Sequence, residues 1–240
     1  MNTKTDIIIA ILKQTNNGHA TRESIVKAVN MPLQLVSNIL REIHEKEFIE
    51  YNNEHIEQTS NQRIELAIHA INNGTDIERI CKVLEWKEFE KFSATAFEKN
   101  NFAVKRNFRF KAAQRRWEID ILAYCEPIIL CVDCKRWRRG WGNSAISKIA
   151  EAQSLRTKLL ANDIQFLQRK IELNNWERAN LFPVILSLFP GSIKIYKKVP
   201  VVPILQLQSF IDEFQGHQSE LANFKSTISN DLSDYLNINS

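Results

Sequence analysis

The chain has 240 residues, of which 44% are hydrophobic and 25% are charged, and its formal net charge is +4. These values are typical of a folded protein with one large domain or two modest ones, and so small a charge does not by itself identify a nucleic-acid partner. No apolar run is long enough to cross a membrane, no secretory signal opens the chain, and four cysteines in a chain of this size do not form a secreted disulfide framework. We therefore expect a cytoplasmic protein with no membrane partner.

Residues 1–58 are predicted to form a small helical domain that ends in a hairpin. Apolar residues at helical spacing predict helices at residues 6–14, 22–29 and 33–47, and Thr21 is a suitable N-cap for the second. Two strand-type runs then flank Asn52-Asn53-Glu54, which is a turn signal. Three helices followed by a two-stranded wing resemble the winged helix-turn-helix fold.

In that family the third helix enters the major groove of DNA. The positions of this helix that we expect to be exposed, and that are therefore candidates for DNA contact, are Gln34, Ser37, Asn38 and Arg41. Many winged helices contact only proteins, and this one has few arginines. Both kinds of partner therefore stay open for the domain.

Residues 59–85 are predicted to be a helical connector, with helices at 60–73 and 76–84. A strongly patterned helix follows at 86–100, because its phenylalanines recur on one side. The simplest interpretation of Glu88, Glu90 and Glu98 is a solvated face of that helix.

Two apolar, strand-type segments at residues 116–123 and 129–135 organise the second half of the chain. They are separated by Cys125-Glu126-Pro127, a turn signal because proline lacks a backbone donor, and a further strand is expected at 102–110. Period-two alternation puts Asp120 on one face with Glu118 and Leu122.

The same alternation puts Asp133 on one face with Lys135. If the two strands pair as a hairpin, two carboxylates and an ammonium group converge in a mostly apolar sheet. Ionised groups are rarely buried without a partner. A divalent metal ion with an activated water is one reason for such a grouping.

The remaining elements complete a mixed α/β domain. Helices are predicted from Asn143 or Ser144 to Leu160 and within 163–173, and strands at 182–188, 193–196 and 201–205. A terminal helix begins near residue 209, and the polar tail is expected to be partly helical.

The order helix, strand, strand with Asp, strand with Asp-x-Lys, helix resembles the PD-(D/E)xK nuclease superfamily. The helix that contains Phe89 and Glu90 and the strand after it look like the entry elements of Mrr-type restriction endonucleases and archaeal Holliday-junction resolvases. The resemblance implies an α/β (α+β), restriction-endonuclease-like core in which helices flank a mixed central sheet. The implied domains are a winged helix at 1–58, a connector at 59–85, a nuclease domain at 86–215 and a tail at 216–240.

The resemblance also implies roles for single residues. Glu90 matches the active-site glutamate of the entry helix, although its neighbour Glu88 is an alternative. Asp120 matches the metal-binding aspartate, and Asp133 and Lys135 match the (D/E)xK pair. The residue before Asp120 is isoleucine where the superfamily's name has proline. Gln153 corresponds either to an accessory glutamine of some branches or to a surface amide.

The chemistry of these residues agrees with the resemblance. Oxygen ligands suit Mg²⁺ or Mn²⁺, and Mg²⁺ typically keeps several waters while it binds one or two carboxylates. Asp120, Asp133 and the backbone carbonyl of Cys134 are the predicted metal ligands. Lys135 can orient the attacking water or stabilise the charge that develops on the phosphate.

Basic residues surround the predicted site. Between Lys105 and Arg139 there are ten basic residues and four acidic ones, a local excess that is typical of surfaces that bind phosphate backbones. The candidates for nucleic-acid contact in this region are Arg106, Arg109, Lys111, Arg115, Arg116, Arg136, Trp137, Arg138, Arg139 and Trp141. The two tryptophans either stack on unpaired bases or pack as part of a lid.

Cys131 and Cys134 form a C-x-x-C, a spacing that is common in zinc and redox sites. Residues three apart on a strand point to opposite faces, so the two thiolates cannot bind one ion. We expect the Cys134 thiol to pack in the core and the Cys131 thiol to lie beside the site.

These inferences favour a Mg²⁺-dependent DNA endonuclease, and a homodimer is one arrangement in which both strands are cut. A DNA-binding regulator whose nuclease fold has lost activity is the first alternative. An RNA endonuclease is the second, because the catalytic groups do not distinguish the sugar.

Overall fold

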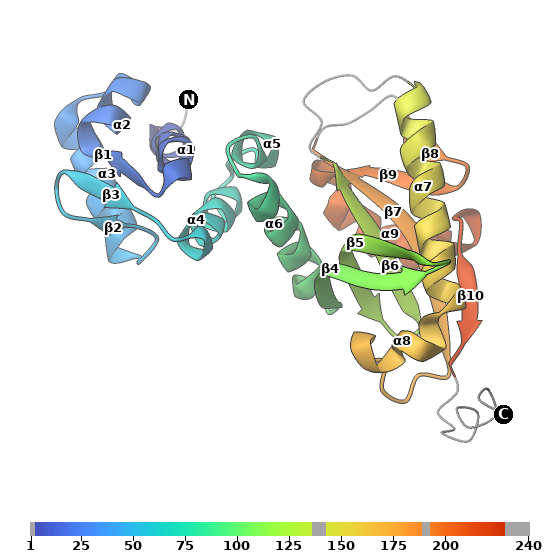
Figure 1. Cartoon of the computed structure of the whole chain (residues 1–240). Coiled ribbons are helices and arrows are strands. Elements are labelled where there is room, and N and C mark those ends of the chain that lie inside the picture. The colour runs from blue at the N-terminus through green and yellow to red at the C-terminus, as the bar shows by residue number, and fades with distance from the viewer. Residues whose placement is uncertain (1–2, 136–142, 189–192, 229–240) are drawn as a thin grey trace. The chain divides into compact units, whose positions relative to one another are not determined.

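The computed structural model describes residues 3–135, 143–188 and 193–228 (Figure 1). The chain divides into two compact units, residues 1–92 and 93–240, and the division falls inside helix α6 (Trp86–Lys99). The sequence instead predicted a domain boundary at the start of this helix. None of the helices in the described ranges is long and apolar enough to span a membrane.

The first unit begins with a winged helix-turn-helix. Its elements are α1 (Thr3–Gln14), η1 (Thr15–Asn17), β1 (His19–Thr21), α2 (Arg22–Val29), α3 (Leu33–Glu45), β2 (Glu50–Tyr51) and β3 (His55–Glu57). The strands form an antiparallel sheet in the order β1-β3-β2. The predicted helices and hairpin are confirmed, whereas β1, only three residues long, was not predicted.

Local sequence explains where the helices of this domain begin and which sides they bury. Thr21 caps α2 in a capping box with Ser24, in which each side chain bonds the other residue's backbone N–H. Helix α3 buries Val36, Leu40 and Ile43. Leu35 on the same helix is apolar but 40% exposed.

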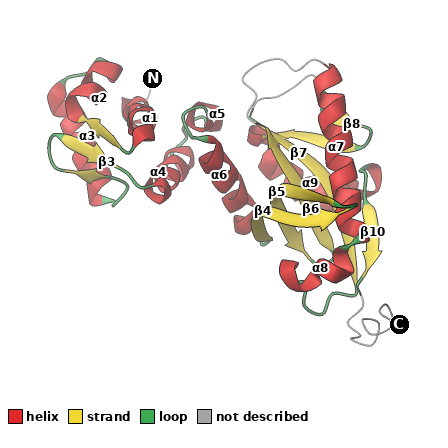
Figure 2. Ribbon diagram, viewed as in Figure 1, coloured by secondary structure: helices red, strands yellow, loops and turns green. Residues whose placement is uncertain are grey.

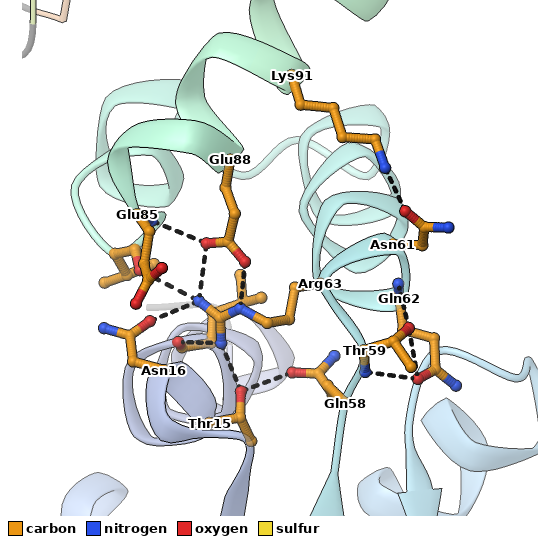
Figure 3. A network of polar contacts seen from close by, with 12 residues as sticks. Thr15, Asn16, Gln58, Thr59, Asn61, Gln62, Arg63, Glu85, Glu88 and Lys91 are labelled. Atoms are coloured by element: carbon orange, nitrogen blue, oxygen red, sulfur yellow. Dashed lines mark hydrogen bonds and ion pairs between the residues drawn. The ribbon is translucent and has the colours of Figure 1, made fainter.

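The remaining helices of the first unit are α4 (Ser60–Asn72), α5 (Ile77–Cys81) and the beginning of α6. A buried polar network ties them to the winged helix (Figure 3). Arg63 on α4 is 3% exposed, and its Nε donates to Glu88 Oε1 on α6 at 2.6 Å. The same guanidinium donates to the Leu12 carbonyl and to Thr15 Oγ1. The solvated face expected for Glu88 is therefore wrong, because this carboxylate is buried with an arginine partner.

The second unit is a mixed sheet with helices on both faces (Figure 2). Its strands are β4 (Ala103–Ala112), β5 (Arg115–Cys125), β6 (Ile128–Lys135), β7 (Arg178–Ser187), β8 (Ile195–Tyr196), β9 (Val199–Pro203) and β10 (Phe224–Thr227). The order is β4-β5-β6-β7-β9-β8, with β10 also paired to β7. Strand β6 pairs antiparallel with β5 and parallel with β7, so the predicted mixed sheet is confirmed.

Helices α7 (Asn143–Asn162) and α8 (Ile164–Ile171) cover one face of this sheet, and α9 (Leu207–His217) lies on the other (Figure 1). Side chains of α7 and α8 pack with β4, β5, β6 and β7 in one buried cluster. On the opposite face, the rings of Phe182 and Phe214 meet edge to face with centroids 4.9 Å apart. Both faces of β6 are consequently buried, which explains its almost continuous apolar sequence.

The segment after α9 differs from the expected polar, partly helical tail. One short helix, η3 (Gln218–Glu220), is followed by β10, which pairs antiparallel with the first half of β7. Strand β9 pairs with the second half of the same edge. The helical expectation is wrong for residues 224–227 because the free edge of β7 supplies backbone partners that local sequence does not reveal.

Candidate active site

Asp120 and Asp133 lie on neighbouring strands at the same level of the sheet. Ile121 pairs with Val132 across the antiparallel β5–β6 ladder, and the next position in this register places Asp120 opposite Asp133. Directly opposed residues on antiparallel strands have Cβ atoms about 5 Å apart. The hairpin pairing on which the predicted convergence depends is therefore present, and the convergence of the two carboxylates itself stays a prediction.

The backbone around Asp120 is less regular than alternation predicts. Ile119 and Leu122 belong to the same buried cluster under α7 and α8, although residues three apart on a regular strand face opposite sides. Glu118, the neighbour of Ile119, therefore does not share a face with Leu122, and that expectation is wrong. Asn107 falls opposite Asp120 in the β4–β5 register and has a φ of 51°, in the left-handed region that asparagine tolerates.

This irregularity lets the Asp120 side chain bond to the backbone of the next strand. Its Oδ2 accepts the N–H of Cys134 at 2.8 Å. Burial raises the pKa of Asp120 above its ordinary value, and the neighbouring Asp133 charge raises the pKa further. The Cys134 hydrogen bond and the charges of Lys135 and Arg156 act in the opposite direction.

Asp133 is buried between two cations. Its carboxylate is 5% exposed, and its Oδ2 lies 2.7 Å from Lys135 Nζ while its Oδ1 lies 3.0 Å from Arg156 Nη1. The Lys135 contact is an ion pair without hydrogen-bond geometry, because Oδ2 accepts no hydrogen bond from the described residues. Lys135 and Arg156 are partly exposed, so they line the open side of the site.

Arg156 is the site residue that the sequence analysis missed. It stands on α7, three residues after Gln153, and residues three apart on a helix lie on the same side. This spacing was the available signal in the sequence. If Gln153 on α7 faces β6, Arg156 faces the same strand. Arg156 was not selected on that signal because a charged residue in a long helix more often faces solvent.

Gln153 holds the helix to the strand beneath it. Its side chain is fully buried, its Nε2 donates to the Cys131 carbonyl at 2.6 Å, and its Oε1 accepts from Arg156 Nη1 at 2.8 Å. These contacts exclude the surface-amide alternative. Gln153 orients Arg156, and Arg156 in turn contacts the Asp133 carboxylate.

Glu90 lies on α6 within the first unit and is 6% exposed. The aspartates lie in the second unit, so the predicted grouping of Glu90 with Asp120 and Asp133 stays a prediction. Glu88, the alternative helix acid, is bound to Arg63. This pairing holds the Glu88 carboxylate within the first unit, and the role of Glu90 stays a prediction.

The second unit contains oxygen atoms that can bind a metal ion. Asp120, Asp133 and the Cys134 carbonyl are hard donors of the kind that Mg²⁺ and Mn²⁺ prefer. The buried Asp133 Oδ2, which accepts no hydrogen bond from the described residues, fits a cation ligand. No group of three histidine, cysteine or acidic side chains suited to a metal occurs in the described part of the chain. The donors therefore fit Mg²⁺ held by two carboxylates and water, and do not fit a site made only of side chains.

The basic residues predicted to bind nucleic acid fall into two groups. Arg106, Lys111, Arg115 and Arg116 are exposed on the β4–β5 hairpin. Arg109, also on this hairpin, is exposed and pairs with Glu118 at 2.6 Å. The five predicted residues of the following loop lie outside the described residues: Arg136, Trp137, Arg138, Arg139 and Trp141.

On the winged helix, Gln34, Asn38 and Arg41 are exposed on α3 as predicted, and Gln34 Nε2 donates to Asn38 Oδ1 at 3.0 Å. Ser37 is 7% exposed, so its predicted exposure is wrong. Ser37 follows the buried Val36 on the inner side of the helix. The exposed face also holds Leu33, which is 49% exposed.

The cysteines behave partly as predicted. Cys134 is buried, and Cys131 packs in the cluster beneath α7. Burial raises the pKa of the Cys131 thiol to about 12. The Cys131 thiol is therefore an unreactive group of the core. The backbone carbonyl of Cys131 accepts a hydrogen bond from Gln153, which links it to the site.

Comparison with known proteins identifies the N-terminal domain. A family described as winged helix-turn-helix matches residues 2–63. An uncharacterized protein from Archaeoglobus fulgidus is 25% identical over 138 residues, which cover 57% of this chain and 97% of that protein. Two solved structures also align: a protein of unknown function, AF1548, with a TM-score of 0.26 and 18% identity, and protein VC1899 from Vibrio cholerae, with a TM-score of 0.43 and 9% identity.

The alignments to these structures cover 41% and 91% of this chain. They cover 44% and 52% of the two structures, so this chain spans about half the length of each.

Proposed function

We propose that the protein is a Mg²⁺-dependent DNA endonuclease of PD-(D/E)xK type that carries a winged helix. The observation that supports this proposal is the placement of Asp120 opposite Asp133 on adjoining strands, with Lys135 paired to Asp133 at 2.7 Å. Two acids and a lysine on adjoining strands of a sheet suit hydrolysis of a phosphodiester, which needs an activated water and stabilisation of negative charge.

The protein's own groups have distinct tasks in this reaction. Asp120 and Asp133 supply negative charge that attracts a divalent ion, and the Cys134 N–H fixes the rotamer of Asp120. Lys135, whose side chain is 27% exposed, is close enough to Asp133 to orient a water beside it or to donate to a phosphate oxygen. Arg156 offers a second cation to the same phosphate.

A bound Mg²⁺ ion would lower the pKa of a coordinated water and polarise the phosphate. Asp120, Asp133 and the Cys134 carbonyl would hold it, with Glu90 as a further candidate. Lys135 and Arg156 form ion pairs with the Asp133 carboxylate in the free protein. At least one of these ion pairs must therefore weaken when the metal ion binds the same carboxylate. The release of these side chains toward the phosphate would couple metal binding to substrate binding.

The winged helix is proposed to bind the DNA through α3. Gln34, Asn38 and Arg41 are exposed on it, and such side chains form hydrogen bonds with base edges and phosphates. The exposed hairpin residues Arg106, Lys111, Arg115 and Arg116 would contact phosphates near the cleavage site.

A substrate panel tests the proposal. Wild-type protein is incubated with duplex, single-stranded, branched and modified DNA, and with RNA, in Mg²⁺ or Mn²⁺. Asp120→Asn and Lys135→Ala should each lower DNA cleavage by about 100-fold or more, the scale of loss of a catalytic charge, while binding changes little. Lys158→Ala removes an exposed charge elsewhere on α7 and serves as the control. Cleavage by both site variants at the wild-type rate would refute the assignment.

One observation favours a second candidate, a DNA-binding regulator with an inactive nuclease fold. Asp133 is paired with two cations, and the described residues offer two clustered carboxylates and not three. A site neutralised by its own side chains needs no metal. Absence of cleavage on every substrate, together with no heat of Mn²⁺ binding in calorimetry, would favour this second function if the protein still binds DNA.

A further inference from the structure

A pocket of about 650 Å³ is lined by the β4–β5 hairpin and helix α8. Residues of β4 and β5 line one side of the pocket, and Leu167 and Lys170 of α8 line the other side. Trp117 in the wall is three residues from Asp120, which is at most about 10 Å of strand. A stacked DNA strand covers that distance in about three nucleotides.

The charged residues of the pocket lining are mostly cationic. They are Arg109, Lys111, Arg116 and Lys170, against one acidic residue, Glu118, which pairs with Arg109. Lys170 was not among the residues selected from the sequence. Its Nζ donates to the Arg109 carbonyl at 2.5 Å, so α8 holds this ammonium at the hairpin. The excess positive charge selects an anionic ligand.

Part of the pocket lining is apolar. Phe110, Trp117 and Leu167 form this part, and the guanidinium of Arg115 lies over the Trp117 ring at 4.6 Å from its centroid. Flat apolar or guanidinium surfaces of this kind stack on nucleobases. Double-stranded DNA presents phosphates at its surface and keeps its base faces stacked inside. A pocket lined by both apolar and cationic residues therefore suits an unpaired nucleotide, whereas a duplex can use only the cationic residues.

We propose that this pocket binds an unpaired nucleotide of the DNA substrate next to the cleavage site. The proposal rests on the proposed function for the identity of the substrate, and it specifies the class: DNA with a single-stranded segment beside the scissile bond. Lys170 and Arg116 would bind the phosphates of that segment, and Leu167 and Trp117 would contact the base.

Binding without metal tests the proposal independently of catalysis. Fluorescence anisotropy in EDTA measures the affinity of the full chain for three labelled DNAs. They are a 12-nucleotide single strand, the same strand with abasic sites in place of its bases, and a blunt duplex of equal charge. We expect the intact strand to bind at least tenfold more tightly than the abasic strand, which has the same charge.

Variants assign this preference to the pocket. Lys170→Ala and Arg116→Ala should weaken binding of the intact strand about fivefold and lower the slope of affinity against salt by about one. Leu167→Ser should reduce the ratio between intact and abasic strands while leaving the salt slope unchanged. Arg169→Ala is the matched control, because this exposed neighbour of Lys170 on α8 does not line the pocket. Circular dichroism verifies that each variant is folded, and Lys170→Arg should restore binding.

Equal affinity of the wild-type protein for intact and abasic strands would refute the proposal, as would equal losses for Arg169→Ala and Lys170→Ala. A cleavage assay run beside these measurements separates the two inferences. Preference for unpaired bases without cleavage on any DNA supports the pocket and refutes the nuclease. Cleavage of DNA without that preference supports the nuclease and refutes the pocket.

Discussion

The carboxylate of Asp120 accepts a hydrogen bond from the backbone N–H of Cys134 at 2.8 Å. At this position between β5 and β6, a side-chain oxygen is the acceptor where a regular sheet would have a backbone carbonyl. This hydrogen bond requires an oxygen atom but not a negative charge. The metal chemistry proposed for the same side chain requires the charge. The structural and catalytic contributions of Asp120 can therefore be separated by substitution.

We expect Asp120→Asn to retain the fold and lose cleavage, because its amide oxygen still accepts the Cys134 N–H. Asp120→Ala should lose cleavage equally and also lower the free energy of unfolding by about 1–3 kcal/mol, since the partly buried N–H of Cys134 loses the Asp120 carboxylate as its acceptor. Denaturant unfolding beside a DNA cleavage assay measures both effects. Equal stability of the Asn and Ala variants would show that the hydrogen bond contributes nothing.

The pKa of Asp120 is raised mainly by burial and next by the charge of Asp133. From this shift we predict how the free energy of unfolding depends on pH. A raised pKa means that the folded state binds the proton more tightly than the unfolded state, whose value is about 3.9. The unfolding free energy then falls as pH rises from about 4 through the folded-state pKa. Asp120→Asn removes this dependence.

The stability of Asp120→Asn relative to wild type should accordingly increase across that pH range and then level off above it. Denaturant midpoints measured for both proteins from pH 4 upward give the difference, in which other titrating groups largely cancel. A constant difference would contradict the raised pKa. Added Mg²⁺ should stabilise wild type more at high pH than at low pH, because the ion binds the deprotonated carboxylates.

The ion pair between Arg156 and Asp133 leads us to predict that Arg156 lowers the affinity of the site for a metal ion. A unit charge 4 Å from another contributes about 4 kcal/mol at an effective dielectric constant of 20, of which solvent screens a part. Arg156→Met removes a cation that competes for Asp133, so we expect Mn²⁺ to bind about tenfold more tightly in calorimetry. Lys158→Met, an exposed change on the same helix, should leave the affinity unaltered. A weaker metal site in Arg156→Met would mean that the arginine organises Asp133 for the ion.

Much of this site could be predicted because it depends on two adjacent strands. A hairpin with a short turn sets its own register, and the register brings Asp120 and Asp133 together. The shift in alternation between Ile119 and Leu122 was not predictable from the same pattern. It accompanies the left-handed conformation of Asn107 on the partner strand, which local sequence does not specify.

The features that were missed depend on tertiary partners. Strand β10 forms only because β7 leaves an edge free, and its sequence lacks the alternation that marks a strand. Glu88 was expected in solvent because isolated acids usually are. Its partner Arg63 is 25 residues away on another helix, and no sequence pattern relates the two.

The cysteines give a chemical test of the core. Cys125 is exposed, whereas Cys81, Cys131 and Cys134 are buried, and burial raises the pKa of Cys131 to about 12. Because the thiolate is the reactive species, we expect one thiol per native chain to react rapidly with a chromogenic disulfide and four to react in denaturant. Cys125→Ser should abolish the rapid reaction. A second rapid thiol in that variant would contradict the burial of the C-x-x-C pair.

The buried pair of Arg63 and Glu88 predicts the stability of the first unit (Figure 3). Both side chains are less than 7% exposed, and the guanidinium also donates to Thr15 and Asn16 of the winged helix. Removing one partner of such a pair typically costs about 3–5 kcal/mol, because the other charge stays buried without compensation. Stabilities of single domains are about 5–15 kcal/mol, so Arg63→Met should leave the unit marginally stable.

Hydrogen exchange of the full chain measures this effect locally, since peptides from α4 and the start of α6 report on the first unit alone. We expect Arg63→Met to accelerate exchange there by at least 100-fold, which corresponds to about 2.7 kcal/mol. Arg79→Met is the matched control, because Arg79 pairs with Asp6 at 2.8 Å while 47% exposed, and exposed pairs contribute at most about 1 kcal/mol. Adding Glu88→Leu to Arg63→Met should recover part of the loss, because it removes the unpaired carboxylate. Similar exchange rates for the Arg63 and Arg79 variants would show that the network does not hold α4 and α6 to the winged helix.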